Sequence, residues 1–260
     1  MNQSKNMHLC NVPKLILLCS TVILMSGRVA AEDFVIYGGE SFQPQIYLKN
    51  GNALGIIPAL LERLSKDTGD HYQLVLVPWK RALSESMAGH GGITSISWTE
   101  QRAAVFDFSD PLYKNLVKLT VLKSRAAEFK DIHDLNGKTL GLPLGTQFGG
   151  AFDQAVANKI ILIDADSSPE SRIKKLLRGR IDVSVLGGPG LKETIRLDPN
   201  LMETYDKLAI LPFPLTEDWM YLAFPKSLHR QAALTRFNKA LAALKKTREY
   251  QKIIDDNSPE

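Results

Sequence analysis

The feature that most constrains the fold is an alternation of short apolar runs with amphipathic runs, and it occurs twice along the chain. The first series predicts strands and helices over residues 34–37, 56–64, 74–77, 81–87 and 93–97. A turn at 134–138 begins a second series, which predicts elements over 139–142, 148–157, 160–163, 168–177 and 182–186. Strands that alternate with helices are typical of α/β proteins. We therefore predict two similar α/β lobes rather than one long sheet.

The last third of the chain supplies further elements. Strands are predicted over 116–122 and 221–224, and one or two helices over 229–255. The helical region carries an apolar stripe at helical spacing, which we interpret as a core face. Its residues are Leu234, Phe237, Leu241 and Leu244.

Two segments are predicted to cross between the lobes, namely the region around Lys123 and the proline-containing segment Leu211–Leu215. Two crossings form a two-strand hinge, and ligands of such proteins bind in the cleft between the lobes. On this interpretation lobe 1 comprises residues 32–123 and 215–260, and lobe 2 comprises 124–214.

The N-terminus has the pattern of a secretory signal peptide. Lys5 and Lys14 precede an apolar run, Leu15–Met25, that is too short to span a bilayer. Val29-Ala30-Ala31 supplies the small residues of a cleavage site, so residues 1–31 are predicted to be removed and the protein to be periplasmic. A retained membrane anchor is the alternative.

Cysteine content and charge exclude several classes of function. The two cysteines, Cys10 and Cys19, both lie in the predicted signal peptide, so the mature chain has no disulfide, thiol nucleophile or thiolate metal site. The formal net charge is +4, and three of the positive charges, Lys5, Lys14 and Arg28, lie in the signal peptide, which leaves +1. That near balance argues against a nucleic-acid-binding protein.

A group of polar side chains near the strand at 93–97 is the first candidate binding site. Thr94, Ser95 and Ser97 bring hydroxyl and backbone N–H groups together, and Arg102 follows shortly. A guanidinium is a planar, two-pronged donor that suits a small carboxylate. The alternative is a solvated Ser/Thr loop with a surface arginine.

Five motifs in order then resemble one family. They are Thr99-Glu100-Gln101-Arg102, Phe108-Ser109-Asp110-Pro111-Leu112-Tyr113, Asp134-Leu135-Asn136-Gly137-Lys138, Gly145-Thr146-Gln147 and Leu177-Arg178-Gly179-Arg180-Ile181-Asp182. Over residues 34–255 the chain resembles the periplasmic solute-binding proteins of the polar amino-acid type, the extracellular receptors of ABC importers. The resemblance implies a two-lobed type II periplasmic binding fold.

The resemblance also implies roles for individual residues. Arg102 would pair with a ligand carboxylate, and Ser95 and Ser97 would supply hydroxyl and backbone contacts. Thr146 and Gln147 would lie in a second-lobe loop whose N–H groups meet the same carboxylate at a helix N-terminus. Alternatively, Thr146 caps the next helix.

Phe42 and Trp79 would form aromatic walls around the ligand side chain, or else pack in a loop and in the core. One departure from the family concerns the acid that usually binds the ligand's α-ammonium, because Gly187 stands at that position. Either another acid, with Glu40 as our candidate, takes its place, or the ligand is not an ordinary α-amino acid.

The sequence therefore predicts a monomeric binding protein that delivers a small polar, carboxylate-bearing solute to a membrane permease. No catalytic residue, metal or organic cofactor is implied. Two alternatives use the same scaffold. One is a sensor that reports its ligand to a membrane kinase or cyclase, and the other is a dehydratase-like enzyme, for which Glu40, or less well His90, would be the general acid.

Overall fold

The computed structural model describes Met1 and residues 31–258, and the residues from Ala31 onward form one compact unit. The predicted signal peptide and its cleavage site lie outside the described residues, apart from Met1 and Ala31. Within the described part of the chain, no helix is long and apolar enough to cross a membrane.

The first sheet contains six strands, and its interior strand β14 comes from late in the chain. The strand order is β5-β1-β6-β14-β7, and β8 also pairs with β14. The strands β1, β5 and β6 are parallel, whereas β14 is antiparallel to β6, β7 and β8. Their bounds are β1 Asp33–Gly39, β5 His71–Val77, β6 Gly92–Ser97, β7 Phe106–Phe108, β8 Tyr113–Val117 and β14 Thr216–Pro225.

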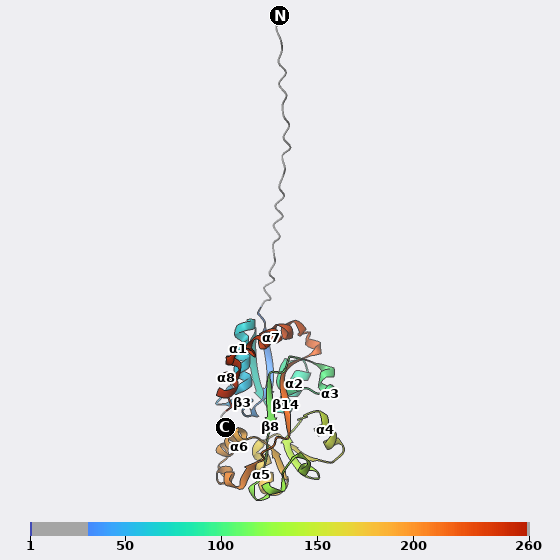
Figure 1. Cartoon of the computed structure of the whole chain (residues 1–260), viewed down its shortest axis with the longest axis vertical. Coiled ribbons are helices and arrows are strands. Elements are labelled where there is room, and N and C mark those ends of the chain that lie inside the picture. Colours follow the sequence, from blue (N-terminus) through green and yellow to red (C-terminus); the bar gives the residue numbers. More distant parts are fainter. Residues whose placement is uncertain (2–30, 259–260) are drawn as a thin grey trace. The chain divides into compact units, whose positions relative to one another are not determined.

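Five helices accompany this sheet (Figure 1). They are α1 Ile56–Thr68, α2 Trp79–Met87, α3 Glu100–Val105, α7 Gln231–Leu244 and α8 Arg248–Asp256. The predicted stripe of α7 is buried in the core cluster of the first sheet, where Phe237 contacts Tyr72 of β5, which confirms it as a core face. The helix α1 continues beyond the predicted range 56–64 and ends at Thr68, where Gly69 adopts a left-handed conformation with φ 77° and donates its N–H to the Ser65 carbonyl.

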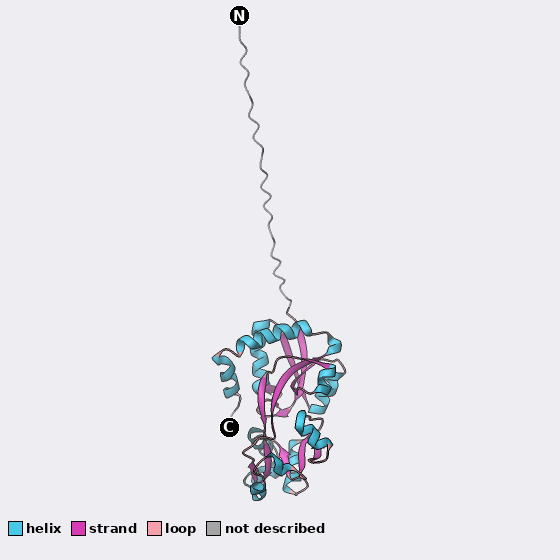
Figure 2. Ribbon diagram, turned by 45° about the vertical axis from the view of Figure 1, so that its right-hand side comes forward, coloured by secondary structure: helices cyan, strands magenta, loops and turns pink. Residues whose placement is uncertain are grey.

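The second sheet has the order β11-β10-β12-β9-β13. Its strands form the lower group of magenta ribbons in Figure 2. Its strands are β9 Leu119–Leu122, β10 Thr139–Pro143, β11 Leu162–Asp166, β12 Val183–Val185 and β13 Leu208–Ile210. Its helices are α4 Gly150–Ala157, α5 Pro169–Leu177 and α6 Gly188–Leu197. Ser168 caps α5 by accepting the N–H of Ser171, with Pro169 at the first helical position.

Each sheet has its own core. Ile36, Leu60 and Phe237 belong to one buried cluster, and Leu140 and Val183 belong to another. Four short 3-10 helices complete the connections, and they are η1 Lys123–Glu128, η2 Ile132–Leu135, η3 Pro199–Lys207 and η4 Lys226–Leu228. The protein thus has the two-lobed α/β fold predicted for it.

The region from 116 to 122, predicted as one strand, is two strands in different sheets. The strand β8 pairs with β14 in the first sheet, and β9 pairs with β12 and β13 in the second. The chain therefore leaves the first sheet at Lys118, earlier than the region around Lys123. The returning segment Leu211–Leu215 runs beside it, because the N–H of Leu215 donates to the Val117 carbonyl at 2.7 Å.

A small antiparallel sheet, which the sequence did not predict, precedes α1. Its strands are β2 Ser41–Phe42, β3 Ile46–Lys49 and β4 Asn52–Leu54. This sheet places Phe42 and the loop that follows it beside the space between the two larger sheets, where a cavity lies.

Candidate functional site

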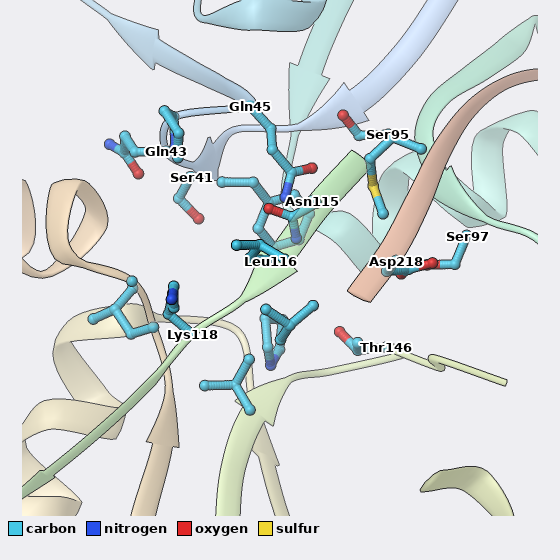
Figure 3. A pocket seen from close by; sticks show the side chains of 18 of the residues that line it. Ser41, Gln43, Gln45, Ser95, Ser97, Asn115, Leu116, Lys118, Thr146 and Asp218 are labelled. Carbon is cyan, nitrogen blue, oxygen red and sulfur yellow. The ribbon is translucent and has the colours of Figure 1, made fainter. Parts of the chain in front are cut away.

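A cavity of about 480 Å³ lies between the two lobes and is lined by residues of both (Figure 3). The predicted site residues Phe42, Trp79, Ser95, Ser97, Arg102, Thr146 and Gln147 all line it. Further lining residues that the sequence analysis did not single out include Gln43, Gln45, Tyr113, Asn115, Lys118, Arg172 and Asp218. Volumes of this size are typical of small-molecule sites.

Arg102 is fixed at the cavity by the start of α3. Thr99 caps this helix by accepting the Arg102 N–H, and the Arg102 side chain turns back so that Nη1 donates to the Ser97 carbonyl at 3.0 Å. Arg102 is 5% exposed, and its burial lowers the pKa of the guanidinium. Its Nε and Nη2 have no hydrogen-bond partner among the described residues. Two buried, unpaired N–H groups on one guanidinium suit a carboxylate acceptor.

A bulge in β6 affects which of the residues Thr94, Ser95 and Ser97 line the cavity. The pairing of β6 with β14 shifts between Tyr221 and Leu222, and Ser95 at this shift has φ 54°. Ser95 and Ser97 consequently line the cavity, and the Ser95 hydroxyl is buried without a partner among the described residues. Thr94 does not line it, since successive side chains of a strand point to opposite faces. The structure therefore does not bring Thr94 to the site.

Phe42 and Trp79 pack together at one wall of the cavity, and Trp79 also belongs to a buried hydrophobic cluster. The rings of Phe42 and Trp79 lie 5.9 Å apart at 58°, and the Arg102 guanidinium carbon lies 5.8 Å from the centre of the Trp79 ring. The indole Nε1 of Trp79 donates to the Gly145 carbonyl at 3.2 Å, so this side chain also connects the two lobes.

The second-lobe loop contributes the side chains of Thr146 and Gln147 to the cavity, and the Thr146 N–H donates to the Pro143 carbonyl at 3.1 Å. Thr146 Oγ1 is buried without a partner among the described residues, and Gln147 Nε2 donates to Gln101 Oε1 of the first lobe at 3.2 Å. The amides of Phe148 and Gly149 both donate to the Asp153 carboxylate. The expected anion position at the start of α4 is therefore occupied by the protein's own side chain. The cap of α4 is Gly149, so Thr146 does not cap this helix.

Asp218 was missed by the sequence analysis. It lies on β14, is 8% exposed, and accepts a hydrogen bond from the Ser97 hydroxyl. Burial raises the pKa of this carboxyl to about 6, although the Ser97 hydrogen bond and the Arg102 charge act in the opposite direction. The available signal was an acid directly before the apolar run Trp219–Phe224.

Arg172 is a second buried guanidinium at the cavity. It lies on α5, is 2% exposed, and its Nη1 donates to Asp166 Oδ1 at 3.2 Å. Its Nε has no partner among the described residues, and burial lowers the pKa of the side chain. Asp166 also pairs with Lys175 at 3.0 Å, so Arg172 shares its counter-ion with another cation.

Glu40 does not reach the main cavity. It lines a separate cavity of about 20 Å³, which shares Phe42 and Trp79 with the larger one, and burial raises the pKa of its carboxyl. The structure therefore does not support Glu40 as the acid that faces a ligand ammonium. Nor do the described residues include a group of three or more His, Cys, Asp or Glu side chains arranged to hold a metal ion.

Comparison with known proteins identifies the family. Residues 35–257 match the bacterial extracellular solute-binding proteins, family 3. The chain belongs to this family. It is 24% identical over 228 residues to the probable amino-acid-binding protein YxeM of Bacillus subtilis (strain 168), which covers 86% of this chain and 84% of that protein.

Two further members illustrate the range of similarity. The chain is 28% identical over 170 residues to ABC transporter arginine-binding protein 1 of Escherichia coli (strain K12), which covers 65% of each chain. Among solved structures, the amino acid ABC transporter substrate-binding protein AbpA of Streptococcus pneumoniae, bound to L-arginine, superposes with a TM-score of 0.67 at 22% identity. That superposition covers 86% of this chain and 94% of that one.

In this solute-binding protein, Gly187 lies at the wall of the cavity. Gly187 and Gly188 line the cavity on the second-lobe side, at the start of α6. A Cβ atom on Gly187 would lie 3.5 Å from Lys118 Cβ, so the nearest side chain at this point is a lysine. The aliphatic part of a lysine from the connection between the lobes therefore lies beside the position where the resemblance predicted an acid.

Proposed function

We propose that this protein binds an amino acid or a related small, carboxylate-bearing solute in the cavity and delivers it to the permease of an ABC importer. Its family and the amino-acid-binding relatives support this role. We further propose that the ligand-binding residues are Phe42, Trp79, Ser95, Ser97, Arg102, Thr146 and Gln147.

The observation that best supports this function is a set of buried polar atoms at one cavity. These atoms have no hydrogen-bond partner among the described residues. They include Nε and Nη2 of Arg102, the hydroxyl of Ser95 and Oγ1 of Thr146, together with Nε of Arg172. An unpaired buried polar group costs about 1–3 kcal/mol, and a carboxylate that accepts from Arg102 removes part of that cost. A ligand that meets both lobes also favours the closed arrangement, because it adds contacts that the open one lacks.

We propose that closure takes place about Lys118 and Leu211–Leu215. These two segments are the connections between the sheets, and the residues on either side of Lys118 bond to the returning segment, since Val117 accepts from the Leu215 N–H at 2.7 Å and Leu119 accepts from the Leu211 N–H at 2.9 Å. Lobe 1 then comprises residues 32–118 and 215–260. The contacts from Trp79 to Gly145 and from Gln101 to Gln147 join the lobes in the closed form.

We also propose a periplasmic, monomeric protein released by cleavage after Ala31. The basic residues, the apolar run and the small residues before Glu32 support export. Intact mass of the protein recovered from the periplasm tests the cleavage site, and light scattering after gel filtration tests the monomer. A mass that includes residues 1–31 contradicts the first proposal.

The main experiment is a thermal-shift screen over the standard amino acids, polyamines and organic acids. A ligand at one hundred times its Kd adds about 2.7 kcal/mol of stability. The hits are then titrated calorimetrically against Arg102→Ala. Removing a desolvated, charge-paired arginine costs about 2–5 kcal/mol, so we expect affinity to fall by about a hundredfold or more.

The matched control for this experiment is Arg81→Ala. Arg81 is exposed on α2, lies outside the cavity and pairs with Glu85 at 3.6 Å. We expect this variant to bind with unchanged affinity. Unchanged affinity in Arg102→Ala would remove Arg102 from the site, and a screen without any hit among amino acids or carboxylates would contradict the proposed function.

A dehydratase-like enzyme is the second candidate, because Asp218 offers a buried carboxyl that can donate a proton at the cavity. Incubation with those hydroxy acids that raise the melting temperature, followed by proton NMR, tests for loss of water. Product formation that disappears in Asp218→Asn would favour the enzyme, and unchanged spectra would favour binding alone.

A further inference from the structure

Asp218 differs in charge from the other ionised residues that line the cavity. It is the one acid among the described residues that line the cavity, whereas Arg102, Lys118 and Arg172 are the cations. No Lys or Arg nitrogen of the described chain lies within ion-pairing distance of its carboxylate. The Arg102 charge acts on it only through space. A buried carboxylate without a paired cation is costly, so its presence at a binding cavity requires a reason.

Ser97 connects Asp218 with Arg102. The carbonyl of Ser97 accepts from Arg102 Nη1 at 3.0 Å, and its hydroxyl donates to the Asp218 carboxylate. In Figure 3 the side chains of Ser97 and Asp218 point toward each other at the cavity wall. One residue therefore separates an incompletely paired guanidinium from an unpaired carboxylate. Two opposite charges held so close together match a small zwitterion better than a ligand with one charge.

The described residues of the opposite cavity wall include no anionic side chain that could bind a cationic group of the ligand. Gly187 and Gly188 have no side chains there, and the Lys118 side chain lies next to the Gly187 Cα. In Figure 3, Lys118 lies toward the left of the view and Asp218 lies toward the right. Among the described lining residues, only the first lobe can bind an ammonium group through charge.

We propose that Asp218 binds the α-ammonium of an amino-acid ligand while Arg102 binds its carboxylate, so that the first lobe alone recognises both charged groups. This inference rests on the proposed function. The resemblance places the acid that binds the α-ammonium on the second lobe, at the position of Gly187. In this protein Asp218 on β14 takes that role instead. The ligand class is thereby restricted to compounds that carry a cationic nitrogen close to a carboxylate.

The protonation of Asp218 is consistent with this role. Its carboxyl has a pKa of about 6 without a ligand, and a bound ammonium would favour the ionised form. The other titratable or charged groups acting on it are Arg102 on α3, Asp153 on α4 and Tyr221 on β14. We therefore expect that binding an amino acid at pH 6 releases a proton from Asp218.

The test compares ligands that differ only in the ammonium group. The probes are L-glutamine, L-glutamate and L-arginine, each with the analogue in which hydrogen replaces the α-ammonium, such as glutarate for glutamate. Each pair is titrated calorimetrically against the wild type and Asp218→Asn. We expect Asp218→Asn to weaken amino-acid binding by about fiftyfold or more and to change the affinity for the analogues by less than about threefold.

Glu40→Gln is the matched control, since Glu40 is an acid on the same lobe outside the main cavity. We expect its amino-acid affinity to equal that of the wild type. If the wild type binds amino acids and Arg102→Ala does not, but Asp218→Asn binds them as well as the wild type, the inference is overturned and the proposed function stands. If the wild type binds none of the probes, the proposed function fails first.

A second measurement needs no variant. Calorimetry of the wild type at pH 6 in two buffers of different ionisation enthalpy reports the protons exchanged on binding. Proton release with an amino acid, and none with its analogue, supports the proposal even if Asp218→Asn does not fold. Equal proton exchange for both members of a pair overturns it.

Discussion

The carboxyl of Asp218 makes the first lobe less stable than it would be with a neutral side chain. Its pKa in the folded protein is about 6, above the ordinary value of an aspartate, because burial disfavours the charged form. The protonated form therefore stabilises the fold fully below about pH 4, and this contribution is lost as pH rises through 6. At pH 7 the folded protein without ligand carries the cost of a buried charge.

We predict that Asp218→Asn stabilises the ligand-free protein at pH 7, on the order of 1–3 kcal/mol. Asn can still accept from the Ser97 hydroxyl and carries no charge. Thermal unfolding at pH 7 and pH 4 measures the effect, and we expect the gain to shrink at pH 4. Asp110→Asn, at an exposed aspartate, is the control. An Asp218→Asn variant less stable than the wild type at pH 7 would contradict the prediction.

Residue positions show how far the sequence alone could predict the site. Arg102 follows its hydroxyl strand closely, so a local pattern sufficed to predict its place at the cavity. Asp218 is 121 positions from Ser97, and only the fold brings them together. Thr94 was included because a hydroxyl-rich run does not reveal which face of β6 lines the cavity, particularly where Ser95 occupies a bulge.

At the scale of elements, long amphipathic helices and apolar strands were predictable, and short elements were not. The helix α1 has five buried residues on one face, which sets its period clearly. The strands β2 and β4 have two and three residues, too few for a period. The break between β8 and β9 was missed because Lys118 interrupts an otherwise continuous strand pattern, and only pairing shows that two sheets share it.

That same break places Lys118 at the cavity, and we expect it to affect ligand selectivity. The described lining residues include three cations and one acid, so an additional positive charge on the ligand is unfavourable. We predict that L-glutamine binds more tightly than L-arginine, and that Lys118→Gln improves arginine binding by about threefold to tenfold. Titration calorimetry of both ligands measures the change.

Lys114→Gln is the matched control for this prediction. Lys114 lies on β8 with Lys118 close by in the chain, but it is exposed, pairs with Glu217 and does not line the cavity. We expect this variant to leave the ratio of the two affinities unchanged. Equal ratios in the wild type and Lys118→Gln would show that the Lys118 charge does not reach the ligand.

At the scale of the whole molecule, the contacts between lobes determine how readily the protein closes. The hydrogen bond from Trp79 to Gly145 is one of them. We predict that Trp79→Phe, which retains an aromatic wall and removes the donor, weakens L-glutamine binding by about threefold to tenfold. We also expect small-angle scattering to show a larger radius of gyration for this variant than for the wild type at subsaturating ligand. Trp98→Phe, at a tryptophan that is 52% exposed, should match the wild type in both measurements.

The place of β14 has a consequence for how the chain acquires its structure. This strand lies inside the first sheet, between β6 and β7, yet its residues 216–225 follow every strand of the second lobe. A chain that emerges from a membrane channel N-terminus first can therefore form the second sheet while the first still lacks an interior strand. The first sheet is complete only after residue 225 has emerged. Until then β6 and β7 are not joined, because β14 lies between them in the sheet. On the export route and the ligand-binding role proposed above, the order of the strands delays completion of the first lobe until translocation is nearly finished.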